Sequence, residues 1–439
     1  PNSVIPSISA QVHAADWHER EVEDLFGITF EGHPRLGDFV LHEQWPEGVN
    51  PMRSDFDASK PYPHREVRPE WQPVRILEAP GAFMMPIGPV YSDYAESAQF
   101  FLETVGEDVV RTTPRFFYKY RGLEKLAEGQ PVERLLLMAE RFSGTAAFAH
   151  SMAFCQAVEK ICGVQPSPRT QALRVLLAEL ERLRSHVGAI AGICRSTALA
   201  VATSQASILE EQLLRLSCVI TGHRYLFGMN VPGGLSMDLR NEKCSELAMS
   251  VATVVEKLAV LHKMLRSTSS FLDRLEEVGI VSEQDATSYG LVGPVARASG
   301  VAADLRKMAP YGSYGVALEF NTAIEFAGDG YARLRVLFSE AQESAEIIRH
   351  MTSGVPPGDV VPADFEVVSG EGLGWVEAPL GAAFHWVKIE ENGKVGRYRV
   401  TPPSFTNWHG FHLAAEDFAF QDFPIILATF GLSCAECDR

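Results

Sequence analysis

The sequence predicts an α+β protein in which a bundle of long helices carries most of the core and short strands lie before and after it. Apolar residues recur at three- and four-residue spacing through several long segments, as in helices with one buried face. Near the C-terminus the pattern changes to short strands around Asn392 and Gly393, a strong hairpin signal because a type I′ turn needs positive φ at both positions. With 439 residues, 46% of them hydrophobic, the chain can bury the cores of two domains.

Composition excludes some classes of function. A net charge of -17 and a pI of about 5.3 argue against a nucleic-acid partner. No apolar stretch reaches the roughly 18 residues that span a bilayer, since Arg195 interrupts the best candidate, so membrane attachment is expected through partners. Cysteines without a regular framework are typical of a reducing compartment. Five of them lie on apolar helical stretches and are predicted to be core: Cys155, Cys162, Cys194, Cys218 and Cys244.

The first 75 residues are predicted to form a separate domain with a linker, and residues 76–439 a second domain. A short amphipathic helix starts near Trp17 and stops at Gly27, and the strand-like residues 28–30 follow. Prolines between residues 61 and 73 favour an extended linker, because each one blocks a helix. After the linker, a hairpin is expected between Gly88 and Gly106.

The second domain is predicted to be helical from about residue 120. Its first long helix opens at Ser167, which can cap it, followed by Pro168, which suits a first turn. Apolar residues then continue at helical spacing to Val187. Three more long helices are expected at about 203–227, 240–275 and 330–353, and together the four suggest a buried bundle. The C-terminal hairpin is expected to pair residues 384–391 with 394–400.

The N-terminal domain resembles a known family. Residues 19–30 and the triplet 32–34 match the E-R-E-x-x-D-x-F-G-I-x-F-x-G-H-P string of the peripheral-arm C subunit of respiratory complex I. The match covers only the end of that subunit, so the resemblance implies a truncated C-subunit-like α+β domain.

Three stretches of the second domain, residues 118–128, 140–150 and 372–386, are similar to large subunits of group 4 membrane-bound, energy-converting [NiFe] hydrogenases and to the homologous complex I D subunit. Fusion of C-like and D-like parts in one chain resembles the formate hydrogenlyase type. The resemblance implies a long-helix bundle of the hydrogenase large-subunit type with small β excursions.

The resemblance also implies which residues make up a site. In the hydrogenases two C-x-x-C pairs hold nickel and iron, and here only Cys434 and Cys437 remain as candidate metal ligands. Ser143 and Ala146 stand at the positions of the other pair, and a hydroxyl or a methyl cannot replace a soft thiolate. Leu380 replaces the arginine that lies over the metals in the family. A [NiFe] centre is therefore expected to be absent.

Three candidate catalytic residues survive in family register: Glu124, Glu377 and His385. In the hydrogenases the glutamate matched by Glu124 relays protons, a task suited to a buried carboxyl group. The alternative is a surface glutamate paired with Lys125 or Lys119.

The matching quinone contacts of complex I are not retained, but Tyr91 and Tyr120 are weak candidates for a quinone-like pocket, since a tyrosine can donate a hydrogen bond to a carbonyl. The alternative is that both are packed core tyrosines. His409 and His412, three residues apart, are a weaker candidate for a zinc-like site with the cysteine pair.

The sequence therefore predicts a subunit of a membrane-associated, hydrogenase-related oxidoreductase complex that couples electron transfer to ion translocation without hydrogen chemistry. The alternatives are a catalytically silent scaffold or coupling subunit and an active [NiFe] hydrogenase or complex I-like quinone reductase. The resemblance implies a small partner with a [4Fe-4S] cluster, a ferredoxin-like iron-sulfur subunit and antiporter-like membrane-arm subunits, with quinone as a possible cofactor. A peripheral place on the cytoplasmic face of the inner membrane is expected.

Overall fold

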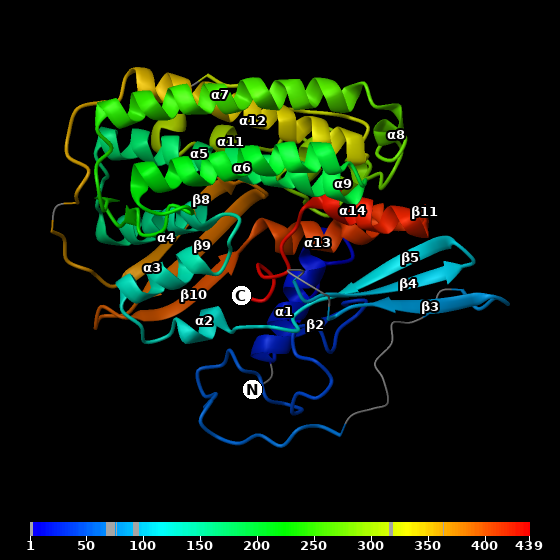
Figure 1. Ribbon diagram of the computed structural model, residues 1–439. Helices are drawn as coiled ribbons and strands as arrows, with labels where there is room; N and C mark the ends of the chain where they lie inside the picture. Colours follow the sequence, from blue (N-terminus) through cyan, green and yellow to red (C-terminus); the bar gives the residue numbers. More distant parts are fainter. Residues whose placement is uncertain (1–2, 67–74, 76, 91–95, 316–318, 363) are drawn as a thin grey trace.

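A computed structural model describes residues 3–66, 75, 77–90, 96–315, 319–362 and 364–439. Four long helices form a layer along one side of the molecule (Figure 1). The central one, α5, packs against α6, α12 and the C-terminal helix α14, and its apolar side chains form the middle of the largest core cluster. The four helices are α5 (Pro168–Ser196), α6 (Ala200–Thr221), α7 (Asn241–Arg266) and α12 (Gly330–Ser353). The predicted α+β fold with a long-helix bundle is confirmed.

The ends of these helices differ from the predicted ones at three places. Helix α6 stops at Thr221, not near residue 227, because Gly222 takes the left-handed conformation that closes a helix. Helix α7 ends at Arg266, and a separate short helix, α8 (Ser269–Leu272), covers part of the stretch predicted to extend it. Helix α5 continues nine residues beyond Val187. Its start is as predicted, with the Ser167 hydroxyl accepting a hydrogen bond from the Thr170 amide.

The scattered cysteines are core residues only in part. Cys155, Cys194 and Cys244 are buried and Cys162 is partly buried, as thiols on apolar helices are expected to be. The prediction is wrong for Cys218, which is exposed because it lies on the solvent side of α6.

A three-stranded antiparallel sheet in the order β10-β9-β8 lies below the helical layer (Figure 1). The predicted hairpin is confirmed as β9 (Gly381–Ile389) and β10 (Val395–Thr401), with Gly393 at positive φ in the turn. Strand β8 (Gly370–Ala378) was predicted only as a family motif, not as a strand. It crosses α4 so closely that a Cβ atom at Gly374 would lie 1.9 Å from the Ala153 carbonyl oxygen.

A second, four-stranded sheet has the order β11-β5-β4-β3. The hairpin expected between Gly88 and Gly106 lies later in the chain. Of the described strands only β4 (Gln99–Val105) falls between these glycines, and Gly106 is in the turn that joins it to β5 (Asp108–Arg115). The edge strands are β3 (Ala82–Ile87) and β11 (Glu416–Ala419). Residues of α13 (Pro403–Ala414) and α14 (Phe423–Phe430) share a core rich in aromatic side chains with this sheet.

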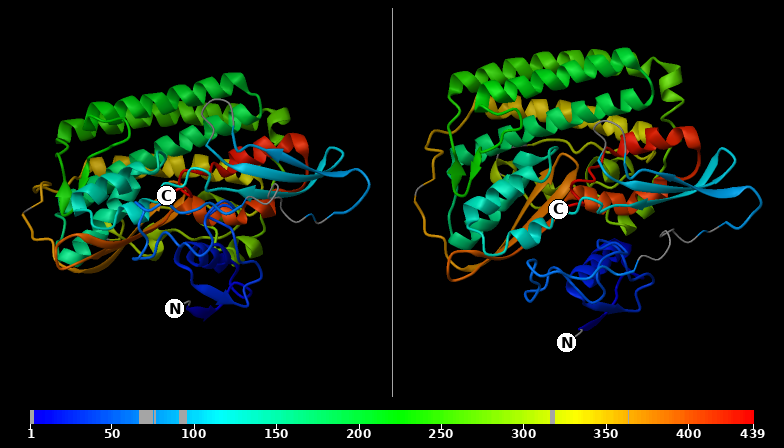
Figure 2. Two further views of the ribbon diagram at one scale, coloured as in Figure 1. Left: turned by 90° about the horizontal axis from the view of Figure 1, so that it is seen from below. Right: turned by 60° about the horizontal axis from the view of Figure 1, so that its bottom comes forward.

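The N-terminal segment folds around α1 (Asp16–Phe26), which Gly27 ends in the left-handed conformation, as predicted. A parallel pair of short strands, β1 (Val4–Pro6) and β2 (Thr29–Glu31), lies beside it. Figure 2 shows this segment below the rest of the molecule, while the C-terminal residues run into the interior between the two sheets. Trp17 joins the aromatic cluster of α13 by packing on Phe405 and His409. The division into two domains near residue 75 stays a prediction.

The remaining elements are short connections or lie beside α5. They are η1 (His13–Ala15), α2 (Leu123–Leu126), α3 (Val132–Arg141), α4 (Ala147–Cys162), β6 (Asn230–Val231), β7 (Gly234–Leu235), α9 (Glu283–Ser288), α10 (Gly293–Ala298), α11 (Leu305–Met308), η2 (Gly312–Tyr314) and η3 (Phe420–Asp422). Within the described ranges, no helix is both long and apolar enough to cross a membrane.

Candidate functional site

Cys434 and Cys437 are buried. They belong to the tail that follows α14 and ends in the interior of the molecule (Figures 1 and 2). The Cys437 amide donates to the Cys434 carbonyl oxygen at 2.9 Å, and the Asp438 amide donates to the same oxygen at 3.1 Å. This tight turn keeps both thiols in the core. Burial raises the pKa of both cysteines, so the two sulfurs are protonated thiols at neutral pH.

Between the two cysteines, the side chain of Glu436 is fully buried and faces Ser143. The Ser143 hydroxyl donates to Glu436 Oε1 at 2.7 Å, and the Ser404 amide donates to Oε2 at 3.1 Å. Burial by itself would raise the pKa of Glu436, but His150 and the two donors lower it overall. We call the buried group of Glu436, Ser143, Cys434 and Cys437 the tail pocket.

His385, one of the three candidate catalytic residues, lies between two other polar side chains in the core. Its Nε2 is 2.9 Å from His150 Nδ1, and its Nδ1 is 2.8 Å from the Tyr398 hydroxyl. Burial, and then the neighbouring His150, lowers the pKa of His385 well below its ordinary value, so the ring is neutral.

Glu124 is buried in a cluster of four charges that joins distant parts of the chain. Its carboxylate accepts hydrogen bonds from Arg399 and from the Val400 amide, the latter at 2.9 Å, and lies 3.5 Å from Arg439 Nε. Glu21 accepts from Arg399 at 3.0 Å and also from Arg439. We call Glu21, Glu124, Arg399 and Arg439 the charge cluster.

The surface alternative for Glu124 is wrong, because its side chain is buried and its ion-pair partners are arginines of the charge cluster. Lys125 instead pairs with Glu128 at 2.7 Å.

The structure describes only one of the two candidate quinone residues. Tyr91 lies outside the described residues. The Tyr120 hydroxyl is buried beside the charge cluster and has no hydrogen-bond partner in the described part of the chain. Burial, with Glu124 and Glu21 next in importance, raises the pKa of Tyr120, so the hydroxyl remains a donor.

Glu377 belongs to a different part of the interior. Its carboxylate accepts from Arg297 Nη1 at 2.8 Å and from the Leu305 amide at 3.0 Å. Arg297 also pairs with Glu340, and the same network of buried charges continues through Glu179 and Arg306. Burial raises the pKa of Glu377. Its partners are not residues of the tail pocket or the charge cluster.

The two histidines of the weaker zinc hypothesis bind other groups. His409 Nε2 is 3.2 Å from Asp16, and His412 Nδ1 is 2.7 Å from the His409 carbonyl oxygen. Among the residues that the structure describes, no group of three or more His, Cys, Asp or Glu side chains is arranged to hold a metal ion.

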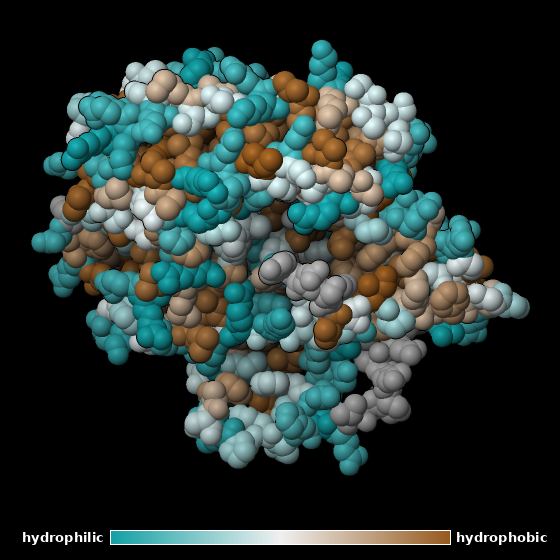
Figure 3. Space-filling model, in the orientation of Figure 1, coloured by the Kyte–Doolittle hydropathy of each residue, from teal (hydrophilic) through white to brown (hydrophobic). Residues whose placement is uncertain are grey.

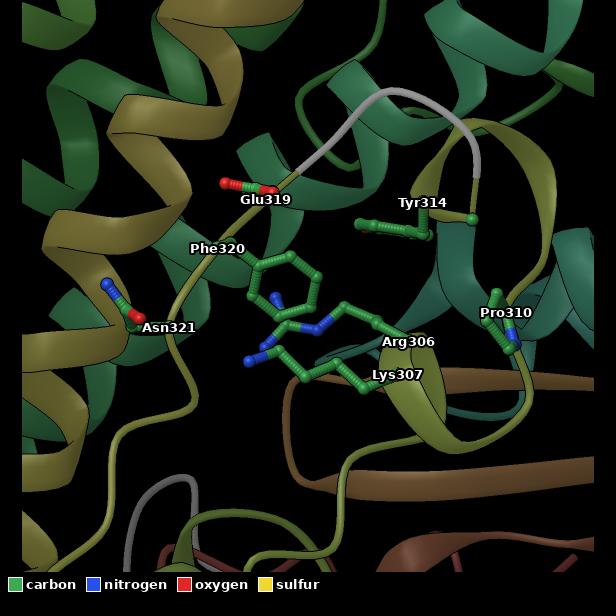
Figure 4. Close-up of a pocket in the computed structure, with 8 residues that line it drawn as sticks. Arg306, Lys307, Pro310, Tyr314, Glu319, Phe320 and Asn321 are labelled. Carbon is green, nitrogen blue, oxygen red and sulfur yellow. The ribbon is translucent and has the colours of Figure 1, made fainter.

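A surface pocket of about 420 Å³ lies near η2, and none of the predicted site residues lines it. Figure 4 shows Phe320 in its middle, with the Arg306 guanidinium group 4.6 Å from the ring centre and Tyr314 pointing toward the ring. Arg306 is itself paired with Asp304 and Glu179.

Sequence reasoning missed several residues of the site. Glu436 lies between Cys434 and Cys437, and a lone acid inside a C-x-x-C pair was an available signal. Glu21 lies in the matched string 19–30, but its buried ion pairs could not be predicted from the string. Tyr398 and Arg399 gave no signal, because a tyrosine and an arginine in a strand are common on solvated surfaces.

Comparisons with known proteins place this geometry in a family. The profile of the respiratory-chain NADH dehydrogenase 49 Kd subunit matches residues 201–368 and 359–439, and that of the 30 Kd subunit matches residues 1–62. Formate hydrogenlyase subunit 5 of Escherichia coli is 29% identical, over 98% of this chain and 76% of the relative. The fused C/D subunit of the NADH-quinone oxidoreductase of Bdellovibrio bacteriovorus is also 29% identical, over 97% of this chain and 81% of the relative.

A solved structure of the membrane-bound sulfane sulfur reductase, an archaeal respiratory membrane complex, contains a similar chain. It has a TM-score of 0.77 and 26% identity, and the match covers 82% of this chain and 99% of that one. The helical bundle, the sheets and the buried tail thus define a large subunit of the complex I and membrane-bound hydrogenase class. The chain belongs to the family of the respiratory-chain NADH dehydrogenase 49 Kd subunit, with a segment of the 30 Kd family ahead of it.

Proposed function

We propose that this chain is the pocket-bearing subunit of a membrane-associated oxidoreductase complex that couples electron transfer to ion translocation, and that it performs no nickel-iron chemistry. Relatives with this fused arrangement include a subunit of formate hydrogenlyase, a component of hydrogenase-4 and C/D subunits of NADH-quinone oxidoreductases. A partner with a [4Fe-4S] cluster, a ferredoxin-like subunit and antiporter-like membrane subunits are the components that this function requires.

The observation that carries the proposal is the contact between Ser143 and Glu436. A nickel-iron centre of this family needs four thiolates, and the tail pocket offers two. At the position of a missing cysteine, the Ser143 hydroxyl is bonded to a carboxylate from the tail itself. The buried Ala146 offers only a methyl group. The residues present therefore do not fit a nickel-iron centre, and we derive no step through one.

Metal analysis of the purified complex tests this proposal. We expect far less than one nickel per chain and no reduction of a viologen dye under hydrogen. Formate hydrogenlyase isolated in parallel is the positive control for both assays. About one nickel per chain, or hydrogen-dependent dye reduction, would contradict the proposal.

The acceptor belongs to one of two chemical classes. A quinone would find one free donor, the Tyr120 hydroxyl, which is buried and has no partner among the described residues. A sulfane sulfur compound would find the thiols of Cys434 and Cys437, and the relative in the sulfane sulfur reductase supports this class. Turnover measured with reduced viologen as the electron donor, and with either decylubiquinone or inorganic polysulfide as the acceptor, distinguishes the two classes. A peripheral place on the cytoplasmic face of the membrane belongs to the same proposal.

A second candidate function is a silent scaffold or coupling subunit. The observation that favours it is the burial of both thiols, because a buried cysteine with a raised pKa is ordinarily unreactive. We favour a redox role for the pair and expect Cys434→Ser with Cys437→Ser to abolish turnover while the complex still assembles. A double variant that assembles and turns over at the wild-type rate would favour the scaffold.

A further inference from the structure

Arg121, which lies just before α2, fastens the C-terminal tail to the rest of the chain. Its backbone amide donates to the Asp438 carbonyl oxygen at 2.9 Å, and its Nε donates to the same oxygen at 3.0 Å. Its Nη2 donates to the Phe142 carbonyl oxygen at 2.9 Å and also to the carbonyl oxygen of Ala435. One residue thus makes four hydrogen bonds to three main-chain oxygens.

These three oxygens belong to the two segments that form the tail pocket. Phe142 directly precedes Ser143, whereas Ala435 and Asp438 lie on either side of Glu436 in the tail. The guanidinium group therefore spans the same two segments that the 2.7 Å hydrogen bond between Ser143 and Glu436 joins inside the pocket. Because both contacts cross the same boundary, the outer one limits how far the two segments can move apart.

Glu96 holds the tail at the same place. Its carboxylate accepts hydrogen bonds from the Ala435 amide at 2.8 Å and from the Ser433 hydroxyl at 3.1 Å. Ala435 is therefore bonded to Glu96 through its N–H group and to Arg121 through its carbonyl group. Two side chains of opposite charge, both more than 300 positions earlier in the chain, fix one residue of the tail. We call Glu96 and Arg121 the tail clamp.

The tail clamp lies on the solvent side of the tail pocket. Glu96 and Arg121 are both exposed, Cys434 is 6% exposed, and Cys437 is fully buried. Cys434 also adjoins Ala435, the residue that the clamp holds. It is therefore the thiol whose access to solvent depends most directly on the clamp.

The contacts of Arg121 need the shape of an arginine as well as its charge. Its partners are main-chain oxygens of three different residues, and a guanidinium group presents its N–H donors in a fixed planar fork. A lysine has the same charge but a single nitrogen at the end of a flexible stem, so it cannot reach all three oxygens at once. Substitutions at exposed positions usually change the stability of the whole fold little, so we expect a local effect.

We propose that Arg121 is the positioning residue of the tail pocket: it holds Cys434 and Glu436 in register with Ser143 and limits the access of solvent to Cys434. Without its guanidinium group the tail would open locally while the helical bundle stays folded. The inference rests on the proposed function, because a redox reaction in the tail pocket requires thiols at a fixed position.

Alkylation of the intact complex with iodoacetamide tests this role without turnover. A buried thiol with a raised pKa reacts only when its surroundings open, so the rate of labelling at Cys434, read by mass spectrometry, reports opening of the tail. We expect Arg121→Gln to raise this rate by about tenfold or more. Arg121→Lys should raise it as well, because it keeps the charge and loses the fork.

Two controls separate local opening from general instability. Cys244, buried on α7, is an internal reference in every sample and should be labelled at its wild-type rate. Arg65→Gln removes another guanidinium group that donates to a main-chain oxygen, that of Glu43, and that pairs with Asp38. Neither partner belongs to the tail, so this variant should leave the labelling rate of Cys434 unchanged.

Three results would overturn the proposal. The first is an unchanged labelling rate of Cys434 in Arg121→Gln, and the second is a wild-type rate in Arg121→Lys, which would show that charge alone is sufficient. The third is an equal acceleration at Cys434 and Cys244, which would show that the variant loosens the whole fold.

Turnover measured on the same samples distinguishes a failure of this inference from a failure of the proposed function. With reduced viologen and the better of the two acceptors, Arg121→Gln should lower the rate by roughly a hundredfold, since a displacement of about 1 Å in a reacting group is enough to do so. Faster labelling of Cys434 with unchanged turnover would support the clamp and contradict the redox role of the thiols. Slower turnover without faster labelling would contradict the clamp.

Discussion

Two carboxylates on the same helix have opposite pKa shifts because their partners differ. Glu21 and Asp24 lie three residues apart on α1. Burial would raise the pKa of Glu21, but Arg439 and Arg399 lower it overall. Asp24 has only backbone amides as close partners, with Leu41 N at 2.6 Å and Phe39 N at 3.3 Å, and burial raises its pKa to about 6. One acid therefore stabilises the fold when it is ionised, and the other when it is protonated.

The first prediction concerns pH. The folded pKa of Asp24, about 6, lies above its ordinary value of 3.8. The stability from this group is therefore fully present below about pH 4 and is lost as the pH rises through 6, by at most about 3 kcal/mol. Asp24→Asn should lack this loss. The difference in unfolding free energy between wild type and variant, measured from pH 4 to 7, reports this loss of stability. A difference that does not vary with pH would contradict the prediction.

The second prediction concerns the charge cluster. Glu21→Gln keeps the shape of the side chain but leaves Arg399 and Arg439 with one carboxylate, that of Glu124. Breaking a buried pair in this way should cost about 3 kcal/mol in unfolding free energy. Glu31→Gln, at an exposed position, is the control and should change stability by less than about 0.5 kcal/mol. Equal effects of the two variants would show that the cluster contributes nothing to stability.

Sequence reasoning reached some residues of the site and not others, for physical reasons. Cys434 and Cys437 stood out because they form the only C-x-x-C pair of the sequence, and both are buried. The partners of His385 lie 235 positions before it and 13 after it, and no local pattern signals such contacts. The roles of Glu124, Glu377 and His385 remain predictions.

At the scale of elements, the close approach of β8 to α4 sets the position of the whole sheet. Glycines at 372 and 374 let the strand lie against the backbone of the helix, where a side chain has no room. The sequence motif around these glycines was readable, but its strand conformation was not, because the close packing that requires glycine involves a helix more than 200 residues earlier. The four long helices and the hairpin were predictable because their apolar spacing and turn residues are local signals.

The third prediction follows from this packing. Gly374→Ala should destabilise the protein by more than about 2 kcal/mol, because the new Cβ atom would lie 1.9 Å from a backbone oxygen that cannot rotate away. The matched control is Gly192→Ala in α5, where nothing lies within 4 Å of the added atom. It should be neutral or stabilise by up to about 1 kcal/mol, since alanine favours a helix. Thermal unfolding of both variants checks the pair, and a small effect at Gly374 would mean that β8 can move.

At the scale of the whole molecule, helix α1 of the N-terminal segment and the C-terminal tail meet at the site. Glu21 comes from the N-terminal segment and Arg439 from the C-terminal tail, and their ion pair links the two ends of the chain in the interior. The tail pocket and the charge cluster are thus held by contacts between segments hundreds of residues apart. Such a site forms only when α1, β10 and the tail have folded against one another, and local sequence patterns could not predict it.

The last prediction concerns the surface. Hydrophobic patches interrupt the polar surface in the region of α6 and α7 (Figure 3). The most exposed apolar side chains of these helices are Val201, Ile208 and Val219 on α6 and Met249 and Val260 on α7, each more than half exposed. Apolar patches of this kind on two neighbouring helices are typical of a contact between proteins. The chain expressed without partners should therefore self-associate and bind a hydrophobic dye.

Replacing two of these residues tests whether this face is responsible. Ile208→Glu with Val260→Glu should lower self-association of the lone chain, because each charge would have to be desolvated in an apolar contact. Phe326→Glu changes an apolar residue that is even more exposed but lies outside α6 and α7, and it is the control. Light scattering on the three proteins measures the effect. A double variant that fails to join the complex, with an unchanged unfolding temperature, would show that this face binds a partner subunit. A lone wild-type chain that is monomeric and binds no dye would contradict the prediction.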